Sequence, residues 1–93
     1  MPTVAFPHDH SDFAARTVAV NGQVLPYVHQ LFWAGHASAA YLPAVAAPVG
    51  LAAGGLPAGI QIVAPYLEDR TALAFAAALA QEIGGFVEPP GLA

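Results

Sequence analysis

The longest stretch of this 93-residue chain without a charged side chain lies between Arg16 and Glu68. It comprises the 51 residues from 17 to 67 inclusive. Charged residues make up 9% of the whole chain, against about 25% in an ordinary soluble domain. A small domain has proportionally more surface to solvate, so it needs more polar side chains rather than fewer. We therefore expect other protein to cover much of the surface of this chain.

A membrane or a nucleic acid is not the expected partner. The uncharged stretch is interrupted by prolines and glycines, among them Pro43, Pro48 and Gly54, and a spanning helix needs about 20 uninterrupted apolar residues. Arg16 and Arg70 are the only basic residues other than histidine, and the net charge is −4, so there is no basic patch to neutralise phosphates. Cysteine is absent, which excludes disulfides and suits a cytoplasmic location.

The first half of the chain predicts a hairpin and a helix. Residues 17–20 alternate in polarity and precede Asn21-Gly22, a strong signal for a two-residue turn to a strand at 23–25. Residues 27–40 follow Pro26 and carry apolar residues at helical spacing. The predicted apolar face of this helix consists of Val28, Leu31, Phe32, Gly35 and Ala39.

The second half predicts two strands and a second helix. Residues 42–50 are apolar at both alternations, which is typical of a strand covered on both faces, although Pro48 favours an edge position or a strand that ends near it. Residues 56–64 are rich in β-branched residues and predict a second strand, and the short loop between the two indicates antiparallel neighbours. Asp69 is the predicted N-cap of a helix over residues 69–83, which Gly84-Gly85 ends. Its predicted buried stripe consists of Leu73, Ala76, Leu79, Ala80 and Ile83.

These elements predict the mixed α/β class, with two helices packed on an antiparallel strand pair. Residues 1–93 are expected to form a single partial domain rather than a self-sufficient one. Residues 86–93 are rich in proline and are expected to form a flexible tail.

No catalytic residue is assigned from the sequence. The serines are Ser11 and Ser38, neither of which lies in a Gly-x-Ser-x-Gly elbow, and lysine is absent. Ser11 could be combined with His8 or His10 and Asp12 on paper, but neighbours in one loop rarely hold a triad without a rigid scaffold.

A metal site is the weaker of two interpretations of residues 8–12. His8 and His10 in a His-x-His pattern can bind one ion, with an aspartate of the same run as a third ligand. A polar surface loop is the favoured alternative. His29 and His36 are seven residues apart, too far for one metal ion on a helix, and we expect them in an interior or an interface. Neither a metal nor another cofactor is expected.

Residues 42–85 carry an ordered pattern. Leu42-Pro43-Ala44 is followed by Pro48 and Gly50, then Gly55-Leu56-Pro57, Gly59 and Gln61, and then Asp69. This order resembles the C-terminal segment of amidase signature family hydrolases, and residues 2–9 and 27–33 are similar to that family more loosely. The resemblance implies one large domain with a central mixed sheet flanked by helices. It also implies amide hydrolysis by a Ser–cis-Ser–Lys triad without a metal or organic cofactor.

The residues of that triad have no counterpart in this chain. The resemblance implies that a segment of this kind supplies sheet strands, a closing helix and part of the acyl-pocket wall. The candidates for this wall are Phe6, His8, His10 and Trp33. The first hypothesis is thus a C-terminal fragment of an amide hydrolase, inactive alone, that acts on a small amide only when completed by the missing amidase body. The alternatives are a non-catalytic module that self-associates through its apolar faces, and a small His-loop metal binder.

Overall fold

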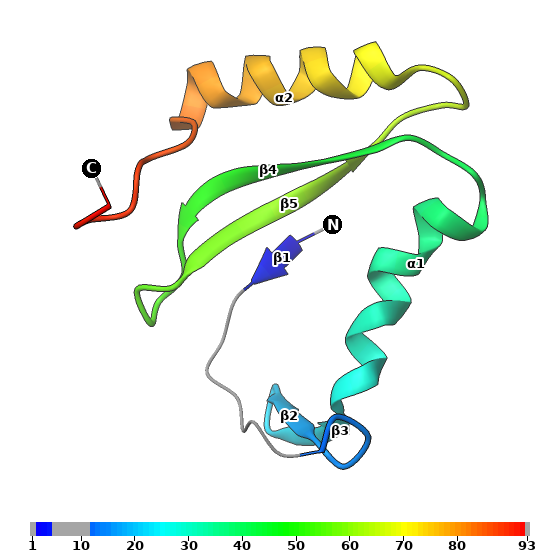
Figure 1. Cartoon of the computed structure of the whole chain (residues 1–93), viewed down its shortest axis with the longest axis vertical. Helices are drawn as coiled ribbons and strands as arrows, with labels where there is room; N and C mark the ends of the chain where they lie inside the picture. Colours follow the sequence, from blue (N-terminus) through cyan, green and yellow to red (C-terminus); the bar gives the residue numbers. More distant parts are fainter. Residues whose placement is uncertain (1, 5–11, 93) are drawn as a thin grey trace.

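The computed structural model describes residues 2–4 and 12–92 (Figure 1). In chain order the elements are β1 (Pro2–Val4), β2 (Thr17–Val20), β3 (Gln23–Pro26), the 3₁₀ helix η1 (Tyr27–Gln30), α1 (Leu31–Ala39), β4 (Ala44–Leu51), β5 (Pro57–Val63) and α2 (Asp69–Ile83). The strands form a three-stranded sheet of order β1-β5-β4 and a separate β2-β3 hairpin, both antiparallel. The predicted mixed α/β class is confirmed.

The β2–β3 hairpin forms where the turn signal places it. Thr17 pairs with Pro26 and Val20 with Gln23, which leaves Asn21 and Gly22 as the two turn residues. Their φ angles are 51° and 78°, and two positive φ angles are what a type I′ turn requires. The structure extends the second strand by one residue beyond the predicted range.

The β4–β5 pair is the centre of the larger sheet. Ala44 lies opposite Val63 and Leu51 opposite Pro57, with a bulge between Pro48 and Gly50. The predicted antiparallel pairing is confirmed. Gly50 adopts a φ of 126° at this bulge, a conformation that side chains with a Cβ rarely adopt.

The two faces of this strand pair are covered to different extents by the described residues. Side chains alternate between faces along a strand. On one face, Val45, Ala47 and Ile62 are half-buried beneath α2. On the other face Ala44 and Ala46 are exposed, whereas Gln61, opposite Ala46, is half-buried.

Helix α2 has the predicted bounds, but its N-cap and buried stripe differ from the prediction. The cap position is Glu68 rather than Asp69, and the Thr71 hydroxyl donates to the Glu68 carboxylate at 3.2 Å. Gly84 ends the helix with a φ of 86°, as predicted.

The buried stripe of α2 is centred on Ala72, which is 1% exposed, and the half-buried residues Ala76, Leu79 and Ala80 share its face. Leu73 and Ile83 are 56% and 50% exposed, contrary to the prediction. The reason is the narrow surface beneath the helix, since α2 contacts little besides β4 and β5.

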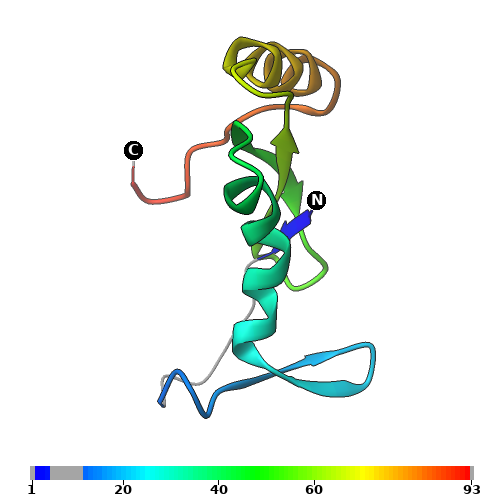
Figure 2. The same ribbon diagram turned by 90° about the vertical axis from the view of Figure 1, so that its right-hand side faces the viewer.

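Helix α1 extends away from the sheet instead of packing on it (Figures 1 and 2). The predicted helix over residues 27–40 divides into a 3₁₀ turn and nine α-helical residues. Its C-terminal end is anchored where Ala37 is buried and its carbonyl accepts a hydrogen bond from the Leu42 N–H at 2.9 Å. The predicted apolar face is exposed, with Leu31 at 61% and Phe32 at 62%.

The chain has a larger accessible surface and a larger radius of gyration than a compact domain of its size. Its accessible surface is 7058 Å², against roughly 5,000 Å² for a compact monomer of 9.5 kDa. The radius of gyration is 15.3 Å, against about 12 Å for a compact domain of this length. The buried apolar residues of the described part are three alanines, Ala37, Ala64 and Ala72. No helix among the described residues is long and apolar enough to cross a membrane.

We predict that Ala72→Leu destabilises the fold, because the added side chain has no space between α2 and the strand pair. The expected loss in the free energy of unfolding is about 1–3 kcal/mol. Urea unfolding followed by circular dichroism measures it. Ala74→Leu is the matched control, because Ala74 is exposed on the same helix, and its change is expected to stay within about 0.5 kcal/mol. Equal losses for the two substitutions would contradict the burial of Ala72 between α2 and the strand pair.

Candidate functional site

An open hollow of about 530 Å³ lies between the β2–β3 hairpin and the η1–α1 helix. It forms because the hairpin leads directly into η1 at Pro26, so that strand and helix side chains converge. Its lining is apolar and aromatic except for one imidazole and one carboxamide. The lining residues are Val18, Val20, Leu25, His29, Gln30, Phe32 and Trp33.

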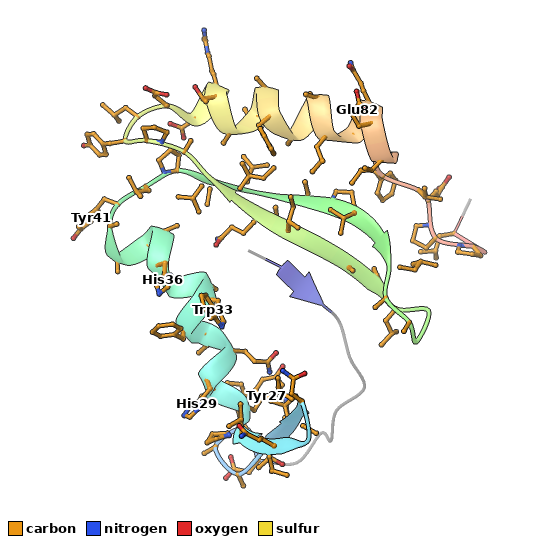
Figure 3. The ribbon with its side chains drawn as sticks, turned by 180° about the vertical axis from the view of Figure 1, so that it is seen from behind. Tyr27, His29, Trp33, His36, Tyr41 and Glu82 are labelled. Carbon is orange, nitrogen blue, oxygen red and sulfur yellow. The ribbon has the colours of Figure 1, made fainter. Side chains whose placement is uncertain are left out.

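Phe32, Trp33 and His36 form a cluster of mutually tilted rings on α1. The ring centroids of Phe32 and Trp33 are 5.3 Å apart, those of Phe32 and His36 4.7 Å, and those of Trp33 and His36 5.6 Å. All three pairs have the edge-to-face geometry that aromatic quadrupoles favour. Trp33 nevertheless remains 58% exposed. Figure 3 shows His29, Trp33 and His36 following one another along the helix.

A second aromatic contact fixes the hairpin to the start of the helix. The Phe13 and Tyr27 rings meet edge-to-face at 5.3 Å. The guanidinium carbon of Arg16 lies 5.0 Å from the Tyr27 ring centroid and 5.8 Å from that of Phe13, within the range of cation–π attraction. The Tyr27 N–H also donates to the Arg16 carbonyl at 2.9 Å. These contacts determine the angle at which η1 leaves the hairpin and therefore the shape of the hollow.

Of the four predicted wall residues, the structure places Trp33 at the hollow. Phe6, His8 and His10 lie outside the described residues, and so does Ser11. The role of Phe6, His8, His10 and Trp33 in a substrate pocket stays a prediction. The remaining lining residues were missed by sequence reasoning, because the contact between hairpin and helix depends on how the chain leaves the hairpin at Pro26 and not on any spacing along the chain.

The described residues contain no assembled catalytic group. Ser38 is exposed on α1, and no hydrogen bond in the described part joins its hydroxyl to a base. No three histidine or acidic side chains in residues 2–4 and 12–92 lie close enough to share a metal ion. Chemically, the hollow can hold an apolar group beside a hydrogen-bonding imidazole, but it lacks a nucleophile with its base.

Two curated proteins contain a segment similar to this chain. Fatty-acid amide hydrolase 2-A of Danio rerio is 52% identical over 48 residues, which are 52% of this chain and 9% of that protein. Fatty-acid amide hydrolase 2 of Homo sapiens is 48% identical over 52 residues, 56% of this chain and 10% of that protein. The resemblance to amidases is confirmed. No protein-family model and no solved structure matches the chain.

The similarity covers about half of this chain and about a tenth of the length of each of these two relatives. The matched segment is about 50 residues long, so it corresponds to only a small part of either relative. Amide hydrolysis, which the names of these relatives state, is an activity of those whole proteins.

We predict that Trp33, the single tryptophan, behaves as a solvent-accessible indole in the isolated chain, because more than half of its surface is exposed. Its fluorescence is expected at the long wavelengths of a hydrated indole and should be quenched by iodide. His36→Ala is a useful comparison, because it removes one ring that shields Trp33 and should increase quenching. A blue-shifted emission that iodide does not quench would contradict this exposure.

Proposed function

We propose that this chain is part of an amide hydrolase, to which it supplies the β4–β5–α2 unit and a helical wall, and that it does not hydrolyse amides by itself. The observation that carries the proposal is the identity of about 50% with two fatty-acid amide hydrolases over half of the chain. The reaction of the completed protein is the conversion of a carboxylic amide to an acid plus ammonia or an amine.

The large accessible surface of the fold supports the proposal that further protein covers part of it. The chain exposes 7058 Å², roughly 2,000 Å² more than a compact protein of its mass. The excess is apolar in character, with Trp33, Tyr41 and Tyr66 all more than half exposed. The face of β4 that carries the exposed Ala44 and Ala46, and the extended helix α1, are surfaces that a larger domain would cover.

The composition supports the absence of independent catalysis. The chemistry implied by the resemblance needs a lysine to activate serine, and the chain contains no lysine. The Lys and the paired serines would therefore belong to the body. In that assembly the hollow at Trp33 would form a wall for the apolar acyl part of the substrate, and Phe6, His8 and His10 remain candidates for the same wall. The absence of cysteine favours a cytoplasmic location.

A chimaera tests the contribution of this segment. We expect the Danio rerio enzyme to keep amide hydrolysis when its 48 matched residues are replaced by those of this chain, because half of the side chains are identical. Deletion of the same residues should abolish hydrolysis. A chimaera in which the replaced segment includes α2 and carries Ala72→Leu should lose stability and activity together. An expressed, folded but inactive chimaera would contradict the proposal.

The isolated chain is expected to release no ammonia or amine from a fatty-acid amide above the uncatalysed rate. Ser38→Ala and Ser11→Ala should leave that background unchanged. Turnover that disappears when Ser11 or His10 is replaced would overturn the assignment of catalysis to the missing body.

A second candidate function is a non-catalytic module that self-associates. The exposed apolar side chains of α1 and of the loops favour it, since a monomer of this kind has too little core to stand alone. Light scattering distinguishes the two: a defined oligomer together with an inactive chimaera would favour the module, whereas an active chimaera favours the amidase segment.

A further inference from the structure

Two large residues, Tyr41 and Leu67, have a backbone conformation that usually belongs to glycine. Their φ angles are 55° and 62°. A residue with a Cβ is disfavoured there because the Cβ comes close to the following carbonyl oxygen, and a bulky residue is an outlier. The other described residues in this region of backbone conformation are of types that tolerate it. They are Asn21, Gly22, Gly55, Gly84 and Gly91.

The end of helix α1 imposes the conformation of Tyr41. The Leu42 N–H donates to the Ala37 carbonyl at 2.9 Å. The Tyr41 N–H donates to the Ser38 carbonyl at 3.3 Å. These two bonds form a Schellman motif, in which the first residue past the cap has a positive φ and is usually glycine. Tyr41 holds this position after the cap residue Ala40, and its side chain is 83% exposed.

A turn between β5 and α2 imposes the same conformation on Leu67. The Glu68 N–H donates to the Pro65 carbonyl at 2.9 Å, which closes a β-turn with Leu67 in its third position. A positive φ at the third position is the mark of a type II turn, which favours glycine or asparagine there. The Leu67 side chain is 75% exposed.

The two positions lie near the same end of the β4–β5 pair (Figure 1). Strand β4 begins where β5 ends, because Ala44 lies opposite Val63. The Ala64 N–H donates to the Pro43 carbonyl at 3.0 Å, and this bond joins the connection before β4 to the connection after β5. Because both large side chains are mostly exposed, contacts within the described chain do little to offset their unfavourable backbone conformation. Unfavourable conformations of this kind are concentrated at functional positions.

We propose that Tyr41 and Leu67 are anchor residues that insert into an apolar surface of the rest of the amide hydrolase. The inference rests on the proposed function, and it adds the place at which the larger protein contacts this segment. The Schellman motif and the turn fix the backbone beneath each side chain in advance, so less conformational freedom is lost on contact. Tyrosine is among the residue types that carry most of the energy of buried contacts.

The rest of an amide hydrolase is the expected partner because of where the anchors lie in the chain. Leu67 lies within residues 42–85, whose ordered pattern resembles amidases, and Tyr41 directly precedes them. The similar segments make up 9% and 10% of the two relatives, so most of such a protein lies outside this segment. No charged residue occurs between Arg16 and Glu68. The partner surface is therefore expected to be apolar, since a charge buried there would be left unpaired.

Substitution by glycine tests the anchors, because it relieves the backbone and removes the side chain at once. In the isolated chain, Tyr41→Gly and Leu67→Gly should each shift the unfolding equilibrium in urea toward the folded state by roughly threefold. Tyr66→Gly is the matched control. Tyr66 is 65% exposed in the same turn as Leu67 but does not have a positive φ, so its replacement should bring no gain in stability.

The opposite effect is expected in a chimaera of the Danio rerio enzyme whose replaced segment includes residues 41–67. There each glycine substitution removes a side chain that is buried against the rest of the enzyme. The half-life of amide hydrolysis at a fixed elevated temperature should fall by about tenfold for Tyr41→Gly and for Leu67→Gly. Sedimentation of the isolated chain should be the same with and without these substitutions.

The outcomes separate this inference from the proposed function. A chimaera without the glycine substitutions that does not hydrolyse amides contradicts the proposed function, and with it the partner named here. An active chimaera whose glycine variants survive heating as long as their parent overturns the anchors alone. So does an isolated chain that gains no stability from the two substitutions. An oligomer of the isolated chain that the substitutions dissociate would also overturn the inference, since it assigns the two side chains to a contact with a second copy.

Discussion

The fold depends on the contact between α2 and the β4–β5 pair. This contact uses small side chains, with Ala72 fully enclosed and Ala47 on the strand beneath half-buried. Small residues allow a helix to approach a sheet closely, but each alanine contributes little apolar area. At about 25 cal/mol per Å², three buried alanines supply a small fraction of the stabilisation that a domain of this length needs. The core of this unit is therefore small.

The exposed apolar side chains are the counterpart of that small core. Phe32, Trp33 and Phe75 are each more than half exposed, and they lie on helices whose inner faces carry alanine or glycine. Large residues thus point away from the contacts that this chain makes with itself. A domain that folds alone places them the other way round. Their distribution is consistent with a layer that lies between other layers of a larger protein.

The site follows from the same incompleteness. The hollow at Trp33 is open and is lined by the hairpin and the helix. It can position an apolar group, while the chemistry proposed for the family requires groups that this chain does not contain.

The sequence by itself determined the elements, because their signals are local: Asn21-Gly22 sets the first hairpin, the apolar runs set β4 and β5, and Gly84 ends α2. It also determined that no lysine is available for catalysis. Only the tertiary structure decided which apolar faces are covered. Leu73 and Leu31 carry the periodicity of buried residues, yet they are exposed here, because burial depends on what lies opposite a face and periodicity records only that the face is apolar. The convergence of Val18 and Trp33 on one hollow likewise depends on the turn of the chain between them.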